Sequence, residues 1–340
     1  MKVIMTLLSS LLYVSSVRRT KFVDGFITSL HRNNLRISNT FKYSIHTLRV
    51  AQEQVSIVQP PLKVNLLTIH EEELETLLQS WKQPKYRAKQ IIDWVKEKGV
   101  SDFDDMNNLP KSLRTILKEN TTIGTLKLDV EMISKDGTRK RAYRLHDGQL
   151  IESVLMPYED GRNTACISSQ AGCAMACSFC ATGQMGFARQ LSPDEIYEQV
   201  ARFSSELRAE NKRLSNVVMM GMGEPLANYR NVIEAIKRMN TDLGIGARKI
   251  TVSTVGIVPN IKKLIEEDIQ VRLAVSLHCA SEEERSALLP ANKRYGGIDT
   301  LMETVKEYID RTNRRVTFEW ALIENGTFRA NFGSGFYSSL

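Results

Sequence analysis

The chain has 340 residues, of which 42% are hydrophobic and 25% are charged, and its net charge is +7. This balance predicts a globular protein with room for two modest domains, and no apolar run is long enough to predict a membrane span. Its 19 Gly and 9 Pro are too few for a fibrous chain, and its 5 Cys are too few for a disulfide scaffold.

The first 52 residues account for the whole net charge, because they hold many Arg and Lys but a single acid, Asp24. From Glu53 onward basic and acidic residues are equal in number. A segment rich in Arg and Ser and almost free of acids predicts an organelle transit peptide at 1–52, for plastid or mitochondrion. Two alternatives stay open: a disordered extension that is not cleaved, leaving a cytoplasmic protein, and a secretory signal built on Val3–Val14.

Residues 65–160 predict a small helical accessory domain followed by a short sheet. Apolar periodicity indicates helices near 69–78 and 86–98 and a third after Pro110. Alternating or β-branched residues then indicate strands at 126–132, 141–145 and 151–156. The pairs Asp136-Gly137 and Asp147-Gly148 separate these strands and predict hairpin turns.

Residues 161–324 predict strands that alternate with helices. The expected strands are 163–168, 216–221, 249–254, 271–277 and 315–322. Ser192 with Glu195, and Ser281 with Glu284, predict capping boxes at two helix starts. Alternation of this kind favours an α/β fold with a parallel sheet curled into a full or partial barrel, in which reactive residues lie at the carboxyl ends of strands.

Three Cys with the spacing C-x3-C-x2-C stand at Cys173, Cys177 and Cys180. Three thiolates can bind three irons of a four-iron cubane and leave the fourth iron open. The amino and carboxylate groups of S-adenosylmethionine (SAM) suit that open position. A fully ligated electron carrier would need a fourth Cys nearby, and a structural zinc site would more often show paired C-x2-C motifs. Three buried thiols packed as small apolar groups are the remaining alternative.

With Phe179 just before its last Cys, this triad resembles the signature of the radical-SAM superfamily. Further segments resemble the RlmN/Cfr family of RNA adenine methyltransferases: Gln83–Gln90, Ile151–Val154, Cys166–Cys173, Gly221–Pro225, Val252–Thr254 and Ser276–His278. The resemblance covers about residues 70 to 324. It implies a partial radical-SAM barrel, a [4Fe-4S] cluster and SAM as cofactors, and methylation at carbon 2 of adenine in 23S-type ribosomal RNA, transfer RNA or both. It also implies an electron donor of the ferredoxin or flavodoxin type, and we expect a monomer with no membrane partner.

The resemblance also implies roles for individual residues. Cys173, Cys177 and Cys180 would bind the cluster. Glu152 would accept a proton, and Cys166 would resolve a covalent link between protein and RNA. SAM would be bound by Gly223, Glu224, Ser253, Ser276, Leu277 and His278. From residue chemistry alone, the glycine-rich turn could be an ordinary loop, His278 a core His, Cys166 a buried strand Cys and Glu152 a solvated acid. Cys279 is expected to be structural.

Beyond the strand at 315–322 the resemblance implies a further helix, a further strand and a tail with a methyl-carrying Cys. Residues 325–340 contain no Cys and no acid, so we expect an unstructured tail outside the family and an inactive or partial isoform. Two other functions remain open: a SAM-cleaving radical enzyme with a different substrate, and a non-catalytic fragment that holds RNA through the helical domain at 71–119.

Overall fold

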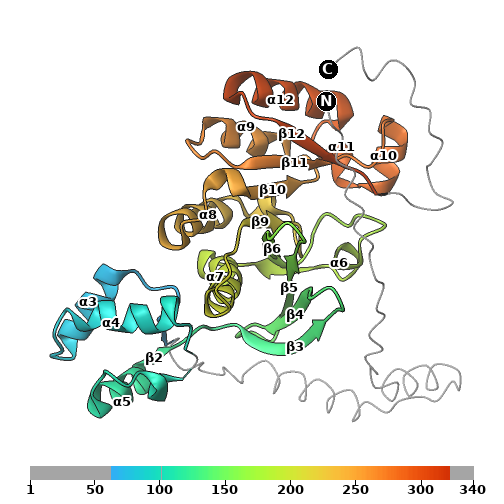
Figure 1. The fold of residues 1–340 in the computed structure, drawn as a ribbon. Helices are drawn as coiled ribbons and strands as arrows, with labels where there is room; N and C mark the ends of the chain where they lie inside the picture. Colours follow the sequence, from blue (N-terminus) through green and yellow to red (C-terminus); the bar gives the residue numbers. More distant parts are fainter. Residues whose placement is uncertain (1–62, 101, 322–340) are drawn as a thin grey trace, which may run out of the picture. The chain divides into compact units, whose positions relative to one another are not determined.

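The computed structural model describes residues 63–100 and 102–321 (Figure 1). The expected transit peptide at 1–52 and the expected tail at 325–340 lie outside the described residues. Within the described part, no helix is both long enough and apolar enough to cross a membrane.

The helical segment predicted before the sheet is present. Its helices are α3 (Glu71–Ser80), α4 (Arg87–Ile92) and α5 (Lys111–Asn120), and its two short strands β1 (Val64–Asn65) and β2 (Thr121–Thr122) pair in parallel. Leu74, Leu78, Ile91, Leu113 and Leu117 are fully buried between these elements. The second predicted helix is not uniform, because α4 passes into a π-helical turn at Asp93–Glu97, where the Lys98 amide donates to the Asp93 carbonyl at 2.9 Å.

Eight strands form one mixed sheet in the order β12-β11-β10-β9-β6-β5-β4-β3. Four are joined antiparallel: β3 (Lys127–Ile133), β4 (Arg139–Arg144), β5 (Leu150–Pro157) and β6 (Asn163–Cys166). Gly137 and Gly148 have positive φ, as the predicted hairpin turns require. The strands predicted for the short sheet are present, and because β5 pairs directly with β6, these hairpin strands continue into the main sheet.

The remaining strands continue from β6 in parallel: β9 (Asn216–Met219), β10 (Ile250–Thr254), β11 (Arg272–Ser276) and β12 (Val316–Glu319). The connections run through α7 (Pro193–Ala209), α8 (Tyr229–Leu243), α9 (Val258–Glu266), α10 (Glu282–Leu288), α11 (Ala291–Arg294) and α12 (Gly297–Thr312). In Figure 1, α7, α8, α9 and α12 follow one another across the sheet, from one strand to the next. Among the described residues β3 and β12 stay at opposite edges, so the sheet is open and the expected α/β partial barrel is confirmed.

Both predicted helix caps are present, but only one is a complete capping box. The Ser192 hydroxyl oxygen accepts from the Glu195 amide, and the Glu195 carboxylate accepts from the Ser192 amide. Ser281 accepts from the Glu284 amide at 3.3 Å without the reciprocal bond. The start of α10 is therefore held by one side-chain hydrogen bond.

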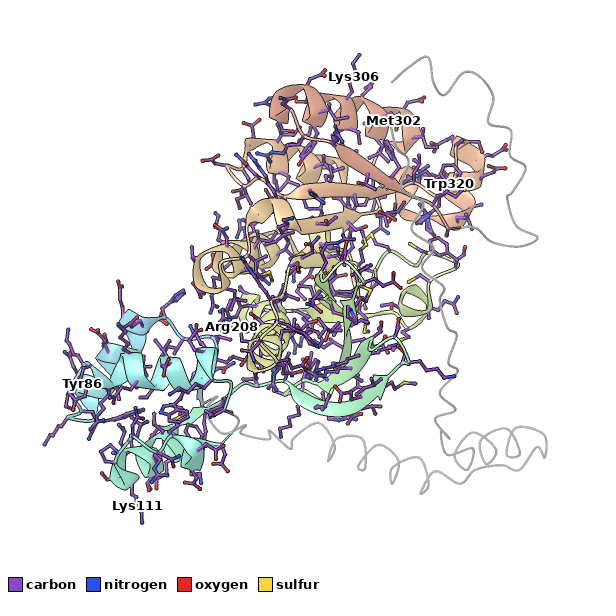
Figure 2. The ribbon with its side chains drawn as sticks, in the orientation of Figure 1. Tyr86, Lys111, Arg208, Met302, Lys306 and Trp320 are labelled. Atoms are coloured by element: carbon purple, nitrogen blue, oxygen red, sulfur yellow. The ribbon has the colours of Figure 1, made fainter. Side chains whose placement is uncertain are left out.

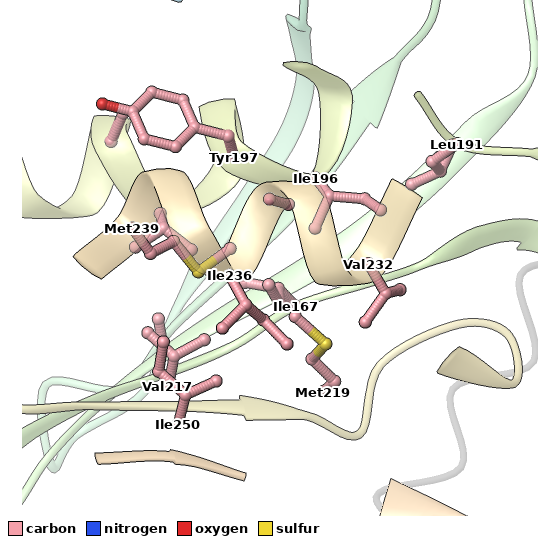
Figure 3. Close-up of a cluster of buried hydrophobic side chains, with 14 of the residues drawn as sticks. Ile167, Leu191, Ile196, Tyr197, Val217, Met219, Val232, Ile236, Met239 and Ile250 are labelled. Atoms are coloured by element: carbon pink, nitrogen blue, oxygen red, sulfur yellow. The ribbon is translucent and has the colours of Figure 1, made fainter. Parts of the chain in front are cut away.

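The main core lies between the parallel strands and helices α7 and α8. Figure 3 shows Val217 and Met219 of β9 and Ile250 of β10 beneath Ile236 and Met239 of α8. All five side chains are at most 2% exposed. Side chains alternate along a strand, so Val218, between Val217 and Met219, lies on the opposite face of the sheet, away from α7 and α8.

The Glu198 carboxylate should be a major source of stability. It is fully buried on α7 and accepts hydrogen bonds from Asn65, from Thr125 and Leu126, and from Arg202. We expect Glu198→Gln to lower the free energy of unfolding by about 3 kcal/mol, because buried donors and Arg202 lose a charged acceptor. Urea unfolding followed by circular dichroism measures this.

The matched control is Glu234→Gln, because Glu234 is exposed on the neighbouring helix α8. It should change stability by less than about 0.5 kcal/mol. Equal effects of the two substitutions would contradict the role given to Glu198.

Candidate functional site

Strand register places the candidate residues on the sheet face opposite to helices α7 and α8. Cys166 pairs with Val154 of β5 and with Val218 of β9, so their side chains share a face. Following the register across the sheet adds four more side chains to this face: Glu152, Ser253, Ser276 and Glu319. The candidates therefore gather on one side although they are up to 124 positions apart, from Glu152 to Ser276.

The three Cys of the triad lie in the loop between β7 (Gln170–Gly172) and α6 (Ala181–Gln184). Cys173 and Cys177 are buried and Cys180 is half-buried. Burial, together with the charges of Cys173, Cys180 and Glu224, raises the pKa of Cys177 to about 12. These four groups are therefore close enough for their charges to act on one another.

The glycine-rich segment after β9 packs tightly against the loop that follows β6. Gly223 has φ +99°, and a Cβ at this position would lie 2.5 Å from Cβ of Gln170. The Glu224 amide donates to Oε1 of Gln170 at 2.7 Å, and the Met222 amide donates to Oγ of Ser168 at 2.9 Å. Glycine is needed at 223 for both its conformation and its close approach.

The Glu224 carboxylate joins the ends of two neighbouring strands. Its oxygens accept from the Leu226 amide at 3.0 Å and from the Val255 amide, just after β10, at 2.8 Å. Burial raises the pKa of Glu224 to about 7, against the lowering effect of these hydrogen bonds. Each carboxylate oxygen has a further lone pair, so the group can still accept from an ammonium group.

Ser276, Leu277 and His278 follow one another at the end of β11. His278 has φ +61° and packs edge-on against Phe179 of the cysteine loop, with ring centroids 4.8 Å apart. Its Nδ1 accepts from the Ala321 amide at 3.0 Å. Burial, helped by the positive charge of Arg285, lowers the pKa of His278 to about 4, so the imidazole is neutral at pH 7. The residue thus connects the cysteine loop to the end of the sheet.

Glu152 and Cys166 lie beside each other on β5 and β6. Because β5 runs antiparallel to β6, Glu152 near its start reaches the same sheet edge as Cys166 at the end of β6. The Ser168 hydroxyl donates to the Glu152 carbonyl at 2.5 Å, and Lys140 of β4 pairs with the Glu152 carboxylate at 2.9 Å. Burial raises the pKa of Cys166 to about 11, and the charge of Glu152 also raises it.

The chemistry of the cysteine loop fits an iron–sulfur cluster. The structure contains no disulfide among the five Cys, and the three sulfur side chains of the loop pack in one cluster. Burial and the neighbouring charges raise the pKa of Cys173 and of Cys177. Positively charged iron would favour their thiolate forms. Within the described residues no three His, Cys, Asp or Glu side chains lie close enough to bind one metal ion. Each thiolate of a cubane binds a different iron, so wider spacing of the sulfurs is compatible with a cluster.

Several residues that shape this region were given no role from the sequence, although Ser168, Gln170 and Thr254 lie inside segments that resemble the family. Ser168, Gln170 and Thr254 hold the loops through hydrogen bonds, and Arg285 donates to the backbone behind Ser276. Lys140 reaches Glu152 only because of strand register. Polar residues of these types are common on any surface, so only their contacts identify them.

Comparison with known proteins matches both parts of the chain. The family model of the Radical SAM superfamily matches residues 167–326, and that of the ribosomal RNA large subunit methyltransferase N-terminal domain matches residues 64–123. The chain is 46% identical over 262 residues to a probable dual-specificity RNA methyltransferase RlmN from Staphylococcus carnosus, covering 76% of this chain and 71% of the relative. A protein of the same name from Dictyoglomus thermophilum is 45% identical over 263 residues, covering 77% and 75%. A crystal structure of a radical SAM methyltransferase from Sphaerobacter thermophilus superposes with a TM-score of 0.72 at 41% identity, covering 82% of this chain and 80% of that one.

Burial of Glu224 should make stability fall as the pH rises. The folded protein holds this proton up to about pH 7, whereas the unfolded chain releases it near 4.5. Between these values the folded state binds more protons, so wild type should lose roughly 3 kcal/mol relative to Glu224→Gln, the loss ending near pH 7. Urea unfolding of both proteins at pH 5, 6 and 7.5 measures the difference, and parallel profiles would contradict it.

Proposed function

The chain belongs to the RlmN family of radical-SAM RNA methyltransferases, and from this premise we propose that it methylates carbon 2 of an adenine in 23S-type ribosomal RNA, in transfer RNA or in both. The observation that carries the proposal is the gathering of three thiols, a buried carboxylate and the ends of β6, β9, β10 and β11 at one edge of the sheet. The RNA substrate is proposed from the names of the matching family and relatives. The residues that would act on it are proposed from the site.

Cys173, Cys177 and Cys180 would hold the [4Fe-4S] cluster, and SAM would lie beside them. Glu224 would accept from the SAM ammonium group, with Gly223 allowing the close approach of the backbone. The other contacts would come from the ends of β10 and β11, through Ser253, Ser276, Leu277 and His278. When bound, the cluster and SAM supply radical chemistry at a ring carbon that an ordinary methyl donor does not reach.

Cys166 and Glu152 would act on the RNA side of the site. Cys166 is a protonated thiol in the free protein, since its pKa is raised to about 11. Resolving a link between protein and RNA requires a nucleophilic thiolate, so a nearby base has to remove the thiol proton. The Glu152 carboxylate shares the face of Cys166, and Lys140 holds it there at 2.9 Å. We therefore assign proton acceptance to Glu152.

The helical segment offers aromatic and basic groups for RNA. Tyr86 is 59% exposed (Figure 2). The guanidinium carbon of Arg87 lies over its ring, 5.0 Å from the ring centre. Lys98 lies 3.8 Å from the ring centre of Trp94. Exposed rings suit stacking on unpaired bases, and cations suit phosphates. A target adenine would have to leave its stack to reach the site.

We also propose an electron donor, a monomeric state and a location in the cell. The radical chemistry needs an electron, so we infer a donor of the ferredoxin or flavodoxin type, and a monomeric protein. The composition of residues 1–52 supports import into a plastid or mitochondrion. The relatives named above are bacterial, so they lend no support to this location.

The proposed chemistry is tested by one anaerobic assay. The protein is loaded with iron and sulfide, supplied with SAM, dithionite and unmodified ribosomal RNA, and analysed for 5′-deoxyadenosine and 2-methyladenosine by mass spectrometry. We expect 5′-deoxyadenosine from wild type and at least a 100-fold loss in Cys177→Ala, because one iron would lose its ligand. Cys279→Ala is the matched control and should keep SAM cleavage.

The two products separate the alternative functions. If SAM is cleaved but no 2-methyladenosine forms, a radical site is present. Either residues 1–340 then supply no methyl-carrying thiol, or the protein acts on another substrate. If 2-methyladenosine forms and Cys279→Ala abolishes it, Cys279 carries the methyl group. If wild type with a full cluster yields neither product, a non-catalytic RNA-binding role replaces the proposed one.

Import is tested by fusing residues 1–52 to a fluorescent protein in plant cells, where plastids and mitochondria can be told apart. We expect the fusion to enter one organelle, because import receptors bind cationic, acid-poor segments. Replacing Arg18, Arg19 and Lys21 by Gln should leave it in the cytosol. A cytosolic wild-type fusion would contradict the transit peptide.

A further inference from the structure

Arg285 is a buried cation at the base of the cysteine loop. It lies on α10, its side chain is the largest of those that are fully buried, and the residue is 1% exposed. Burying a guanidinium is costly unless each of its N–H groups finds an acceptor. The contacts of Arg285 therefore indicate what it holds in place.

The acceptors of Arg285 are backbone carbonyls at the ends of two strands. Its Nη2 donates to the Val255 carbonyl after β10 at 2.6 Å and to the Ser276 carbonyl at 3.2 Å, and its Nε donates to the Leu277 carbonyl at 3.2 Å. Its Nη1 donates to the side-chain carbonyl of Asn292 on α11. One side chain thus connects the loops after β10 and β11, which carry the proposed SAM contacts.

The charge of Arg285 has no carboxylate partner among the described ion pairs. Other buried Arg do: Arg238 pairs with Asp194, and Arg141 pairs with Glu131 and Glu206. The nearest acid in its network is Glu282, which it reaches only through Asn292, whose Nδ2 donates to Oε1 of Glu282 at 2.7 Å. The guanidinium stays protonated in proteins, so the positive charge remains largely uncompensated.

This charge lies beside the cysteine loop. The Ser178 amide donates to the Leu288 carbonyl at the end of α10, at 3.0 Å. Cys173, Met175 and Cys177 pack in one apolar cluster with Leu289 and Ala291. The charges of Cys177 and Arg285 act on each other, as do those of Arg285 and His278. An anionic thiolate-bound cluster at Cys177 would face the unpaired guanidinium.

We propose that Arg285 is a positioning residue that also raises the reduction potential of the cluster held by Cys173, Cys177 and Cys180. A fixed positive charge in a dry site stabilises the form that carries an extra electron, and cluster potentials respond to nearby charge and hydrogen bonding. The same side chain holds the two strand ends through its carbonyl contacts. The inference rests on the proposed cluster.

The test is an anaerobic redox titration of the loaded protein without SAM or RNA, with the reduced cluster quantified by electron paramagnetic resonance. Arg285→Gln should lower the ratio of reduced to oxidised cluster about tenfold at a fixed potential, because one charge is lost near the site. Arg285→Lys retains the charge and should stay within about threefold of wild type. Arg238→Gln removes a buried Arg from α8 as a matched control and should leave the ratio unchanged.

Glu282→Gln provides a second variant if Arg285→Gln does not retain its cluster. It removes the acid that lies beyond Asn292, so the reduced-to-oxidised ratio should rise about twofold, a small effect because this carboxylate is exposed. An unchanged or lower ratio would overturn the proposal.

The outcomes separate this inference from the proposed function. If wild type binds no four-iron cluster, the proposed function fails together with the inference. If the cluster forms and Arg285→Gln leaves its potential unchanged, only the inference fails. An equal fall in Arg285→Lys and Arg285→Gln would show an effect of geometry instead of charge and would also overturn it.

Discussion

The buried carboxylate of Glu224 holds the loops at the strand ends together, and the arrangement of the site depends on it. The carboxylate accepts from the Val255 amide after β10 and from the Leu226 amide in its own loop. The Glu224 amide donates to the side chain of Gln170, the first residue of β7. Segments from three parts of the chain thereby meet at one residue, through its carboxylate and its backbone amide. Burial makes the ionised form costly, and a cationic ligand group beside it would offset that cost.

Arg285 is the positive counterpart of Glu224. It extends the hydrogen-bonded connection from the end of β10 to the end of β11, and both charges lie near Cys177. Neither forms an ion pair with a side chain among the described residues. In the proposed enzyme each unpaired charge has a complementary group, the SAM ammonium for Glu224 and the anionic cluster for Arg285. Both charges are thus in place before the proposed cofactors bind.

Much of the local structure could be predicted because its signals are local. The hairpin turns at Gly137 and Gly148 follow from Asp-Gly pairs, and the Ser192 cap follows from its spacing to Glu195. That the short sheet continues into the main sheet could not be read from the sequence, because pairing between β5 and β6 depends on contacts that no window of sequence contains. The π-helical turn after Ile92 was also missed, since hydrophobic periodicity does not distinguish it from an α-helix.

By itself the sequence determined the spacing of Cys173, Cys177 and Cys180, the alternation of strands and helices, and the motifs that mark the family, because these depend only on the order of residues. Only the tertiary structure decided that Glu152 lies beside Cys166, because antiparallel pairing brings the start of β5 to the end of β6. It also decided that Lys140 holds Glu152 and that Arg285 connects two strand ends. Strand register and burial join residues that are distant in sequence, and those two properties arise only when the sheet forms.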